Sequence, residues 1–531
     1  MTKPTTVRKY GKATKKSRAE LLFAELPKSP IVKDPKPKRV PEPEPEQEQD
    51  IGPESTPLPE VEAETSDDIN EITDKLLSVT LTESTTPIGK PRTKQTPFAT
   101  PKTPALQLVP EDPEDLRILT WDDVCPFGDR VEKIAEASYA EVYRITNERG
   151  VSIIKVIRLK SPIKPQTKAQ ERSGLVDEEP HCESDLLGEL RISEWLADIP
   201  GFVVYKERYI VKGKAPKALL ETHQAFHRRM KRKDPDRLQF YPSPSRYLDD
   251  TQFLVVELGD AGTALEGFQL NSAAQLWDIF LHTAIALARA EDLVKFEHRD
   301  LHEGNLCIRQ VKPSVTKDDN GPCQFGYSGL DITILDYGLS RAADPDFDEC
   351  ETAPVFYDLE KDLCIFTSTH APQCKVYREM RSFLLKGDRL HLPPSEHDTP
   401  YAPGVDGKPV SWAPHYPYTN VLWLAYVYQY LITHFKGEQK ELSAFKRATK
   451  ELLIHLRPDA PRHVLSFPSA CDVVRYAAEA GWVSPEQLVD ESSRLDDWEG
   501  GSIIEAKTAE AEVSHLRRSP RRAATGAKEA S

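Results

Sequence analysis

The chain of 531 residues carries a formal net charge of −15 at pH 7, and 44 of its residues are proline. This length allows two to three domains, and the acidic balance argues against a protein that binds nucleic acid over its whole surface. The eight cysteines contain no Cys-x-x-Cys pair, so they indicate neither a zinc site nor a disulfide framework. The longest apolar run, at 421–432, is too short to cross a bilayer, and no apolar signal segment follows Met1. We therefore expect an intracellular protein without membrane contact.

The two ends of the chain differ in composition from its middle. Residues 1–113 are rich in proline and charge, and residues 491–531 run from acidic to basic. Both stretches have too few apolar side chains to offset the entropy that is lost on folding. We expect 1–113 to be a disordered regulatory arm and 491–531 to be a disordered tail. The arm holds Ser-Pro and Thr-Pro steps, beginning at Ser29, that are candidate sites for proline-directed kinases.

The folded remainder, 114–490, is organised around the sequence EHRDLHEGN at 297–305, which is followed by LDYG at 335–338. Transfer of a phosphoryl group to a hydroxyl needs a carboxylate that accepts the proton and oxygen ligands that hold Mg²⁺ on the phosphates. Asp300 would be the base, and Asn305, five residues later, would be a metal ligand. Asp336, after a predicted strand at 332–335, would be the second ligand. Each residue alone also suits a turn or a cap, but the ordered set is typical of a kinase.

An alternating segment at 131–143 predicts a strand, a turn and a strand, in the place of the glycine-rich loop of kinases. All three glycine positions are alanine in this chain, namely Ala135, Ala137 and Ala140. Glycine lets backbone amides approach phosphates closely, and alanine permits this less freely. We expect a nucleotide loop of reduced affinity.

The segments that follow supply the other nucleotide contacts. Lys155, in a predicted strand at 152–157, suits a phosphate-binding lysine. Its expected partner is a carboxylate on a helix at 186–196, either Glu189 or Glu194. A buried strand at 253–258 would end at a gatekeeper, Leu258, and the backbone from Gly259 to Ala261 would contact adenine. A helix at 273–292 then leads into the catalytic loop.

Two charged stretches bear on partners. After Asp336 no Ala-Pro-Glu follows, and 344–362 carries eight acidic residues. Carboxylates in this region would attract a basic peptide, although a solvated loop is the alternative. The basic cluster at 228–233 is either a solvated helix face or a site for nuclear import or weak contact with the DNA backbone.

Together these motifs resemble the haspin-type protein kinases. The residues that carry the resemblance are HRDLHEGN at 298–305, LDYGLSR at 335–341 and YPYTNVLWL at 416–424. His302, where most protein kinases have lysine, and the missing Ala-Pro-Glu are typical of this family. The resemblance implies an α+β, bilobal kinase-like fold, with an N-lobe at 114–262, a C-lobe at 263–490 and a divergent activation segment that needs no phosphorylation.

The resemblance also implies a function. It suggests a serine/threonine kinase that uses ATP and Mg²⁺ to phosphorylate the third residue, a threonine, of the histone H3 tail in mitosis. The protein would be nuclear and chromosome-associated, with cytoplasmic residence in interphase as an alternative. The resemblance favours Glu189 over Glu194 and assigns the other site residues by position. The catalytic residues would be Lys155, Glu189 and Asp300, the metal ligands would be Asn305 and Asp336, and the substrate contacts would be Glu266, His302 and Asp362.

The arm contains a copy of part of that substrate. RTKQT at 92–96 reproduces the second to sixth residues of the histone tail, with Pro91 in place of the free N-terminal alanine. A tethered copy has a high effective concentration, so that even weak binding counts. We hypothesise a substrate mimic in which Thr93 occupies the active site or is autophosphorylated.

Two other functions remain open. A pseudokinase scaffold at chromatin would explain the alanines in the nucleotide loop. A small-molecule phosphotransferase of the aminoglycoside or choline kinase type shares the pattern Asp-Leu-His-x-Gly-Asn. The intact set around Asp300 argues against the first, and Arg299 together with the acidic segment argues against the second.

Overall fold

The computed structural model describes residues 116–504, except for 138–139, 169, 171–179, 181–182, 236–238, 240, 318–320, 345–352, 370 and 490–500. The predicted arm at 1–113, with the substrate-like segment around Thr93, lies outside the described residues. So does most of the predicted tail at 491–531.

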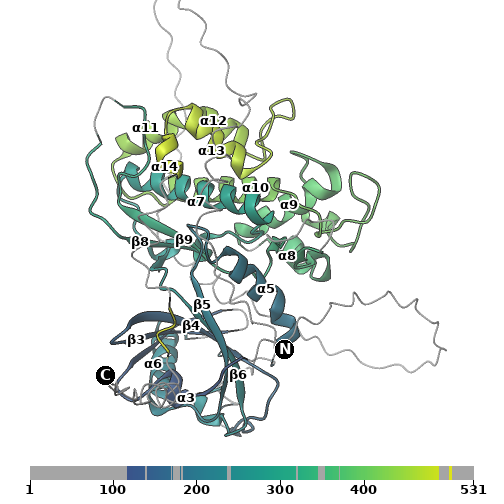
Figure 1. Cartoon of the computed structure of the whole chain (residues 1–531). Helices are drawn as coiled ribbons and strands as arrows, with labels where there is room; N and C mark the ends of the chain where they lie inside the picture. Colours follow the sequence, from purple (N-terminus) through teal and green to yellow (C-terminus); the bar gives the residue numbers. More distant parts are fainter. Residues whose placement is uncertain are drawn as a thin grey trace, which may run out of the picture.

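A six-stranded sheet forms the smaller lobe, at the bottom of Figure 1. Its strand order is β1-β5-β6-β4-β3-β2, and β1 pairs parallel with β5 while the other pairs are antiparallel. The strands are β1 (Ile118–Thr120), β2 (Arg130–Glu136), β3 (Glu141–Asn147), β4 (Gly150–Arg158), β5 (Tyr205–Lys212) and β6 (Gln252–Leu258). The helices of this lobe are α3 (Trp121–Val124), α5 (Glu183–Leu196), α6 (Lys217–Lys233) and the short η1 (Pro244–Arg246).

Both faces of this sheet are covered, which explains the continuous apolar run in β6. Phe253 and Val255 pack into one hydrophobic cluster, whereas Leu254 and Val256 pack into a second cluster that contains Leu190 of α5. Because successive side chains of a strand point to opposite faces, a strand that is buried on both sides needs apolar residues at every position. Helix α5 therefore lies against the face that looks toward the larger lobe (Figure 1).

The larger lobe is mostly helical. Its helices are α7 (Ala273–Val294), α8 (Cys364–Thr367), α9 (Gln373–Lys386), α10 (Tyr418–Thr433), α11 (Gln439–Ala448), α12 (Lys450–Leu456), α13 (Ala470–Glu479) and α14 (Pro485–Val489). Short strands and 3-10 turns lie between them: β7 (Thr263–Ala264), η2 (Leu265–Gly267), η3 (Glu303–Asn305), β8 (Leu306–Gln310), β9 (Leu330–Ile334), β10 (Arg341–Ala342), β11 (Val355–Phe356), η4 (Leu359–Lys361) and η5 (Pro394–Glu396). The predicted α+β, two-lobed architecture is confirmed.

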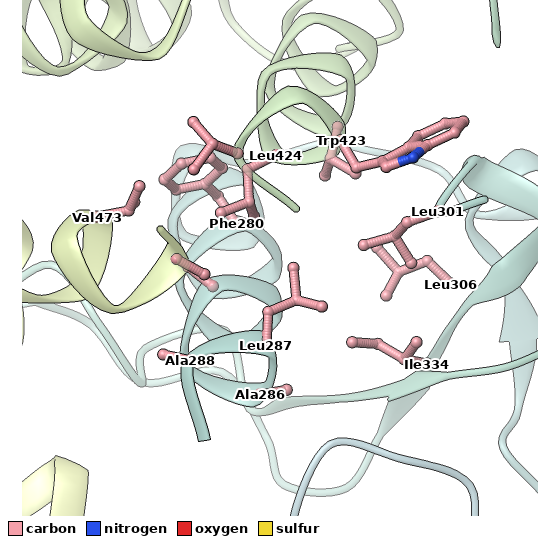
Figure 2. Close-up of a cluster of buried hydrophobic side chains, with 14 of the residues drawn as sticks. Phe280, Ala286, Leu287, Ala288, Leu301, Leu306, Ile334, Trp423, Leu424 and Val473 are labelled. Carbon is pink, nitrogen blue, oxygen red and sulfur yellow. The ribbon is translucent and has the colours of Figure 1, made fainter. Parts of the chain in front are cut away.

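Helix α7 is the centre of the larger lobe. It begins with a capping box between Ser272 and Gln275 and ends at Lys295, whose backbone is left-handed with φ 50°. Apolar residues lie on all sides of the helix, as expected for a helix that is buried all round. Figure 2 shows Phe280 and Leu287 of α7 in one cluster with Trp423 of α10 and with Leu301, the residue that follows Asp300. The predicted catalytic loop is thus anchored directly in the main core.

No helix among the described residues is both long and apolar enough to span a membrane.

Residues 501–504, which fall in the predicted disordered tail, lie against the sheet, where a short yellow segment is seen beside β4 in Figure 1. Ile503 and Ile504 are buried in the same cluster as Phe253. The carboxylate of Glu257, which is fully buried, accepts hydrogen bonds from Ser502 Oγ at 2.6 Å and from the amide of Ile503 at 2.9 Å. For these four residues the prediction of disorder is wrong. The two isoleucines are buried against the existing apolar face of the sheet, so the segment needs no core of its own.

We expect the double change Ile503→Ala and Ile504→Ala to lower the melting temperature of the full chain by several degrees. A buried isoleucine replaced by alanine typically costs about 2–5 kcal/mol, because apolar contacts are lost and a cavity remains. Thermal unfolding followed by circular dichroism measures the effect. Ile454→Ala, at a side chain that is 40% exposed, is the matched control. An unchanged melting temperature in the double variant would mean that the segment does not stabilise the lobe.

Candidate active site

Lys155 and Glu189 form an ion pair across the smaller lobe. Lys155 lies on β4 and Glu189 on α5, and 2.8 Å separates Nζ from Oε1. Glu194, the competing carboxylate, lies on the same helix but pairs with Arg208 of β5 instead. The structure therefore brings together the pair that the resemblance favoured.

Asp336 completes the polar wall of this site. Its backbone is left-handed, with φ 62°, and its Oδ1 accepts a hydrogen bond from the Gly338 amide at 3.2 Å. Burial acts to raise the pKa of Asp336, but the positive charge of Lys155 and the Gly338 amide hold it below its ordinary value. Asp336 is thus an anion at neutral pH. It lines one cavity together with Lys155, Glu189 and a largely apolar set: Ile157, Leu186, Leu190, Ser193, Val203, Val256, Leu258 and Tyr337.

The apolar wall of the cavity differs in detail from the expectation. Val256, rather than Leu258, is the residue of β6 that lies opposite Lys155 in the register of the two strands. The side chains of Val256 and Leu258 lie on the same face of β6, and both line the cavity. The amide of Gly259 donates to the carbonyl of Val204 at 2.9 Å, so this part of the predicted adenine-binding backbone already has a partner. No described contact of Ala261 tests its predicted role.

Asp300 is held by one residue of the catalytic loop and by one residue of helix α9. The side-chain amide of Asn305 donates to the backbone carbonyl of Asp300 at 2.9 Å and lies 3.5 Å from Oδ2. The hydroxyl of Tyr377, on α9, donates to Oδ1. Burial is the main cause that raises the pKa of Asp300 to about 6, which leaves the carboxylate ionised at pH 7. This is the protonation state that a general base requires.

His298 fixes the loop to the strand that precedes Asp336. Burial lowers its pKa to about 4, so the ring is neutral at pH 7. Its Nδ1 accepts from the amide of Asp300 at 3.2 Å, so that Nε2 carries the proton and donates to the carbonyl of Leu335 at 2.9 Å. The amide of Leu335 in turn donates to the carbonyl of Asn305 at 2.9 Å. Asp300, Asn305 and Asp336 are therefore held in one hydrogen-bonded unit.

The residues predicted to bind metal have suitable chemistry for Mg²⁺. Because the nitrogen of Asn305 bonds to Asp300, its side-chain oxygen is the atom able to bind a cation, and Asp336 adds an anionic oxygen. Mg²⁺ is commonly held by one or two protein oxygens together with substrate phosphates and water. Among the described residues there is no group of three or more His, Cys, Asp or Glu that could hold a metal on its own. Two protein oxygens fit a metal that is also held by the phosphates of a nucleotide.

A buried carboxylate, Glu297, was missed by the sequence analysis. It accepts hydrogen bonds from Arg299 Nε at 3.1 Å, from Thr419 Oγ1 at 2.9 Å and from the amide of Tyr416 at 2.6 Å. Asn420, the residue after Thr419, accepts a hydrogen bond from the amide of His298 at 3.0 Å. The sequence YPYTN at 416–420 therefore holds the catalytic loop in place, which its spacing alone does not reveal.

The nucleotide loop is fixed by one contact within the loop and by one contact from outside it. Ala140 is fully buried, and its carbonyl accepts from the amide of Ala137 at 2.8 Å. The carbonyl of Ala137 accepts from the hydroxyl of Tyr241 at 2.5 Å. Ala135 follows a register shift between β2 and β3. Residues 138–139, at the tip of the loop, lie outside the described residues.

Helix α6 adds a second support under this loop. Lys133 of β2 is buried and pairs with Glu136 at 2.7 Å and with Glu141 of β3. His227 and His223 of α6 reach the same carboxylates, with His227 3.2 Å from Glu136 and His223 3.0 Å from Glu141. Helix α6 thus fixes both strands of the nucleotide loop through buried polar contacts.

The predicted substrate residues fall into two places. Burial, with the negative charge of Glu303 nearby, raises the pKa of Glu266, and His302 acts in the opposite direction. Glu303, which sequence analysis did not single out, accepts from the hydroxyl of Tyr426 at 2.5 Å. Asp362 accepts from the amide of Cys364 at 3.0 Å, and no contact among the described residues joins it to the group around Glu266.

One acidic residue of the predicted peptide-binding segment is not available to a peptide. Glu360 is buried and forms a two-point ion pair with Arg381, with both distances 2.9 Å. Burial acts to raise the pKa of Glu360, but the hydrogen bonds from Arg381 hold it below its ordinary value. Its role is structural, and a count of charges along the sequence could not distinguish it from exposed neighbours.

We expect Tyr241→Phe to raise the KM for ATP about threefold to tenfold, with a smaller change in kcat. The change removes the hydroxyl that holds Ala137 and leaves the ring in place; a neutral hydrogen bond contributes about 0.5–1.5 kcal/mol. Steady-state kinetics at varied ATP concentration give both constants. The control is Tyr428→Phe, which removes a buried hydroxyl that bonds to Thr449, far from the nucleotide loop in the sequence. An unchanged KM for ATP would contradict a role for Tyr241 in shaping the loop.

Comparison with known proteins agrees with this geometry. The family model described as "Haspin like kinase domain" matches residues 107–464. The chain is 28% identical over 388 residues to the Schizosaccharomyces pombe serine/threonine-protein kinase haspin homolog hrk1, covering 68% of each chain. It is also 28% identical to serine/threonine-protein kinase haspin of Mus musculus, covering 65% of this chain and 41% of the mouse protein. The Drosophila melanogaster haspin homolog is 27% identical, with 56% of this chain and 47% of that protein covered. The chain therefore belongs to the haspin-like family of serine/threonine protein kinases.

Proposed function

We propose that this protein is an active kinase that uses ATP and Mg²⁺ to phosphorylate a threonine in the basic N-terminal tail of histone H3. The observation that carries the proposal is the intact pair Lys155–Glu189, at 2.8 Å, beside the linked unit of Asp300, Asn305 and Asp336. This set is what a pseudokinase would lose. When bound, Mg²⁺ would neutralise the charge that develops on the transferred phosphoryl group.

The protein's own residues divide the work. Lys155, oriented by Glu189, is placed to bind nucleotide phosphates, and Asp336 with Asn305 supplies the oxygens for the metal. Asp300 accepts the proton of the substrate hydroxyl, and its pKa of about 6 leaves it ionised at pH 7. The apolar walls of the cavity, including Val256 and Leu258, exclude water around the nucleotide.

The charge near the catalytic loop supports a basic peptide as the substrate. Glu266 and Glu303 lie close enough for their charges to interact, next to His302. Paired carboxylates attract an arginine or lysine side chain more strongly than either does alone. The identity of the peptide, its phosphorylation in mitosis and a nuclear, chromosome-associated location are proposals that rest on the family.

Activity without phosphorylation of the activation segment also belongs to the proposal. Arg299, which follows His298, is fully buried, where its guanidinium pairs with Glu297 at 3.1 Å and donates to the carbonyl of Trp412 at 2.8 Å. The arginine therefore has its counter-charge inside the lobe. A phosphate on the activation segment is not required to supply it.

The basic cluster on α6 is proposed as a weak contact for the DNA backbone. Arg228, Arg229 and 231–233 are exposed, whereas His223 and Phe226 of the same helix are buried. The helix therefore presents its basic face to solvent while its other face supports the nucleotide loop. Such a contact would weaken as salt is raised.

The first test uses the full chain, radiolabelled ATP with Mg²⁺, and a peptide of the histone H3 tail. We expect phosphate transfer to the peptide with threonine at its third position and none to the peptide with alanine there. Asp300→Asn should reduce kcat about 100-fold or more, because loss of a general base typically costs 10²–10⁴-fold. Asp398→Asn, at an exposed carboxylate, is the matched control.

Three outcomes would count against the proposal. Equal labelling of the two peptides would exclude the proposed substrate. Full activity of Asp300→Asn would exclude the assignment of the base. Transfer to an aminoglycoside or choline but not to peptide would favour the small-molecule phosphotransferase.

The second test concerns the substrate-like segment at 92–96. We propose that Thr93 competes with the histone tail in cis or is itself phosphorylated. Thr93→Ala should abolish autophosphorylation at this position, or change the KM for the tail peptide, because the competing segment is altered. Mass spectrometry of the autophosphorylated chain and peptide kinetics measure the two effects, with Thr103→Ala as the control in the same arm. If both measurements equal those of the wild type, the segment is not a substrate mimic.

A further inference from the structure

Tyr377 contacts the catalytic carboxylate but lies outside every part of the kinase motif. It lies on α9, 77 residues after Asp300, and its hydroxyl donates to Asp300 Oδ1. In the catalytic loop itself, the side-chain donor to Asp300 in the described contacts is Asn305, which reaches the backbone carbonyl at 2.9 Å and Oδ2 only at 3.5 Å. The hydrogen bond to Oδ1 of the carboxylate therefore comes from α9, outside the catalytic loop.

The phenol ring is held firmly. Tyr377 is 7% exposed, and its ring meets the indole of Trp423 edge to face, with 5.6 Å between the ring centres. Trp423 is fully buried on α10, and Figure 2 shows it in the cluster that contains Leu301, within the catalytic loop, and Leu306, directly after it. The hydroxyl of Tyr377 and the backbone of Asp300 are thus anchored in the same core. Neither group can move away from the other without repacking this core.

We propose that Tyr377 is a positioning residue for the general base, and that its hydroxyl fixes the orientation of the Asp300 carboxylate for the acceptor hydroxyl. This inference rests on the proposed kinase function. With Oδ1 bonded to Tyr377, Oδ2 is the oxygen that accepts the proton of the substrate. The proton of the threonine hydroxyl moves to Oδ2 while the threonine oxygen bonds to the γ-phosphorus of ATP. The bond from that phosphorus to the bridging oxygen breaks, and ADP leaves with that oxygen.

The position of the donor has an electrostatic reason. Burial is the main factor that disfavours the ionised form of Asp300, the charge of His302 opposes it, and the negative charges of Asp336 and Glu303 add a repulsion. A donor that points at the carboxylate offsets this repulsion, and a neutral phenol does so without adding a cation that would compete for the phosphates or the metal. Because the donor is rigid, it loses little conformational entropy when the substrate arrives.

A different interpretation assigns the opposite effect to the same contact. The hydroxyl of Tyr377 could stand where the acceptor hydroxyl must bind, so that it inhibits the free enzyme. Burial of the ring against Trp423 argues against this interpretation, because an inhibitory group must leave when substrate binds. The two interpretations predict changes of opposite sign in kcat when the hydroxyl is removed.

The test is Tyr377→Phe in the full chain, assayed with ATP, Mg²⁺ and the histone H3 tail peptide. We expect kcat to fall about 10-fold to 100-fold, in line with the contribution of a hydrogen bond to a charged group. The KM values for ATP and for peptide should stay within about twofold, and the melting temperature should be unchanged. Tyr428→Phe, which removes a buried hydroxyl bonded to Thr449 on the same lobe, is the matched control and should leave kcat unchanged.

A double-mutant cycle separates positioning from a general structural effect. In the Asp300→Asn background, Tyr377→Phe should cause no further loss, because the carboxylate that it positions is absent. The proposal is overturned if kcat rises, if kcat is unchanged, if the loss persists in the Asp300→Asn background, or if it is accompanied by a lowered melting temperature. A wild-type chain that does not label the peptide would instead contradict the proposed function, which is a distinct result.

Discussion

A single buried carboxylate, that of Glu297, determines the shape of the catalytic loop. An ionised group that is removed from water costs several kcal/mol unless it is paired and hydrogen-bonded. Glu297 meets this condition with three donors: Arg299 from its own loop, Thr419 from the first turn of α10, and the amide of Tyr416 just before that helix. These hydrogen bonds therefore fix the catalytic loop against the N-terminal end of α10.

This constraint extends to the chemistry. The loop continues from Glu297 through His298, whose neutral ring bonds to the Asp300 amide and the Leu335 carbonyl, to Asp300 itself. Arg299 and Asp336 adopt left-handed backbone conformations, with φ 65° and 62°. For residues other than glycine such conformations are strained, and they persist where the surrounding contacts over-determine them. The hydrogen bonds of Glu297 and His298 are such contacts, so the strain at the two functional positions is balanced by polar interactions inside the larger lobe.

What could be predicted from the sequence is what depends on neighbours along the chain. The strand that carries Lys155, the central helix α7 and the order of the acidic and amide residues from Asp300 to Asp336 all follow from local patterns. The choice between Glu189 and Glu194 did not follow from periodicity, since both lie on α5. The ion pair of Glu189 with Lys155 and the pairing of Glu194 with Arg208 separate them. Tyr377, Tyr426, Tyr241 and the buried pair Ile503 and Ile504 were not predicted. Each acts through a contact with a residue far away in the sequence, and a tyrosine or an isoleucine carries no local signal that reveals such a partner.

The alanine-containing nucleotide loop shows how a local departure can be compensated by a distant one. Glycine would give the loop freedom to approach phosphates, but this freedom is lost when the loop is ordered and so costs entropy. Alanine reduces both the freedom and the cost. In this chain Tyr241, in the segment after α6, holds the carbonyl of Ala137, and His227 and His223 of α6 hold β2 and β3. The loop therefore owes its shape to contacts with α6 and the segment after it, and the absence of glycine at its three positions does not by itself indicate that nucleotide binding has been lost.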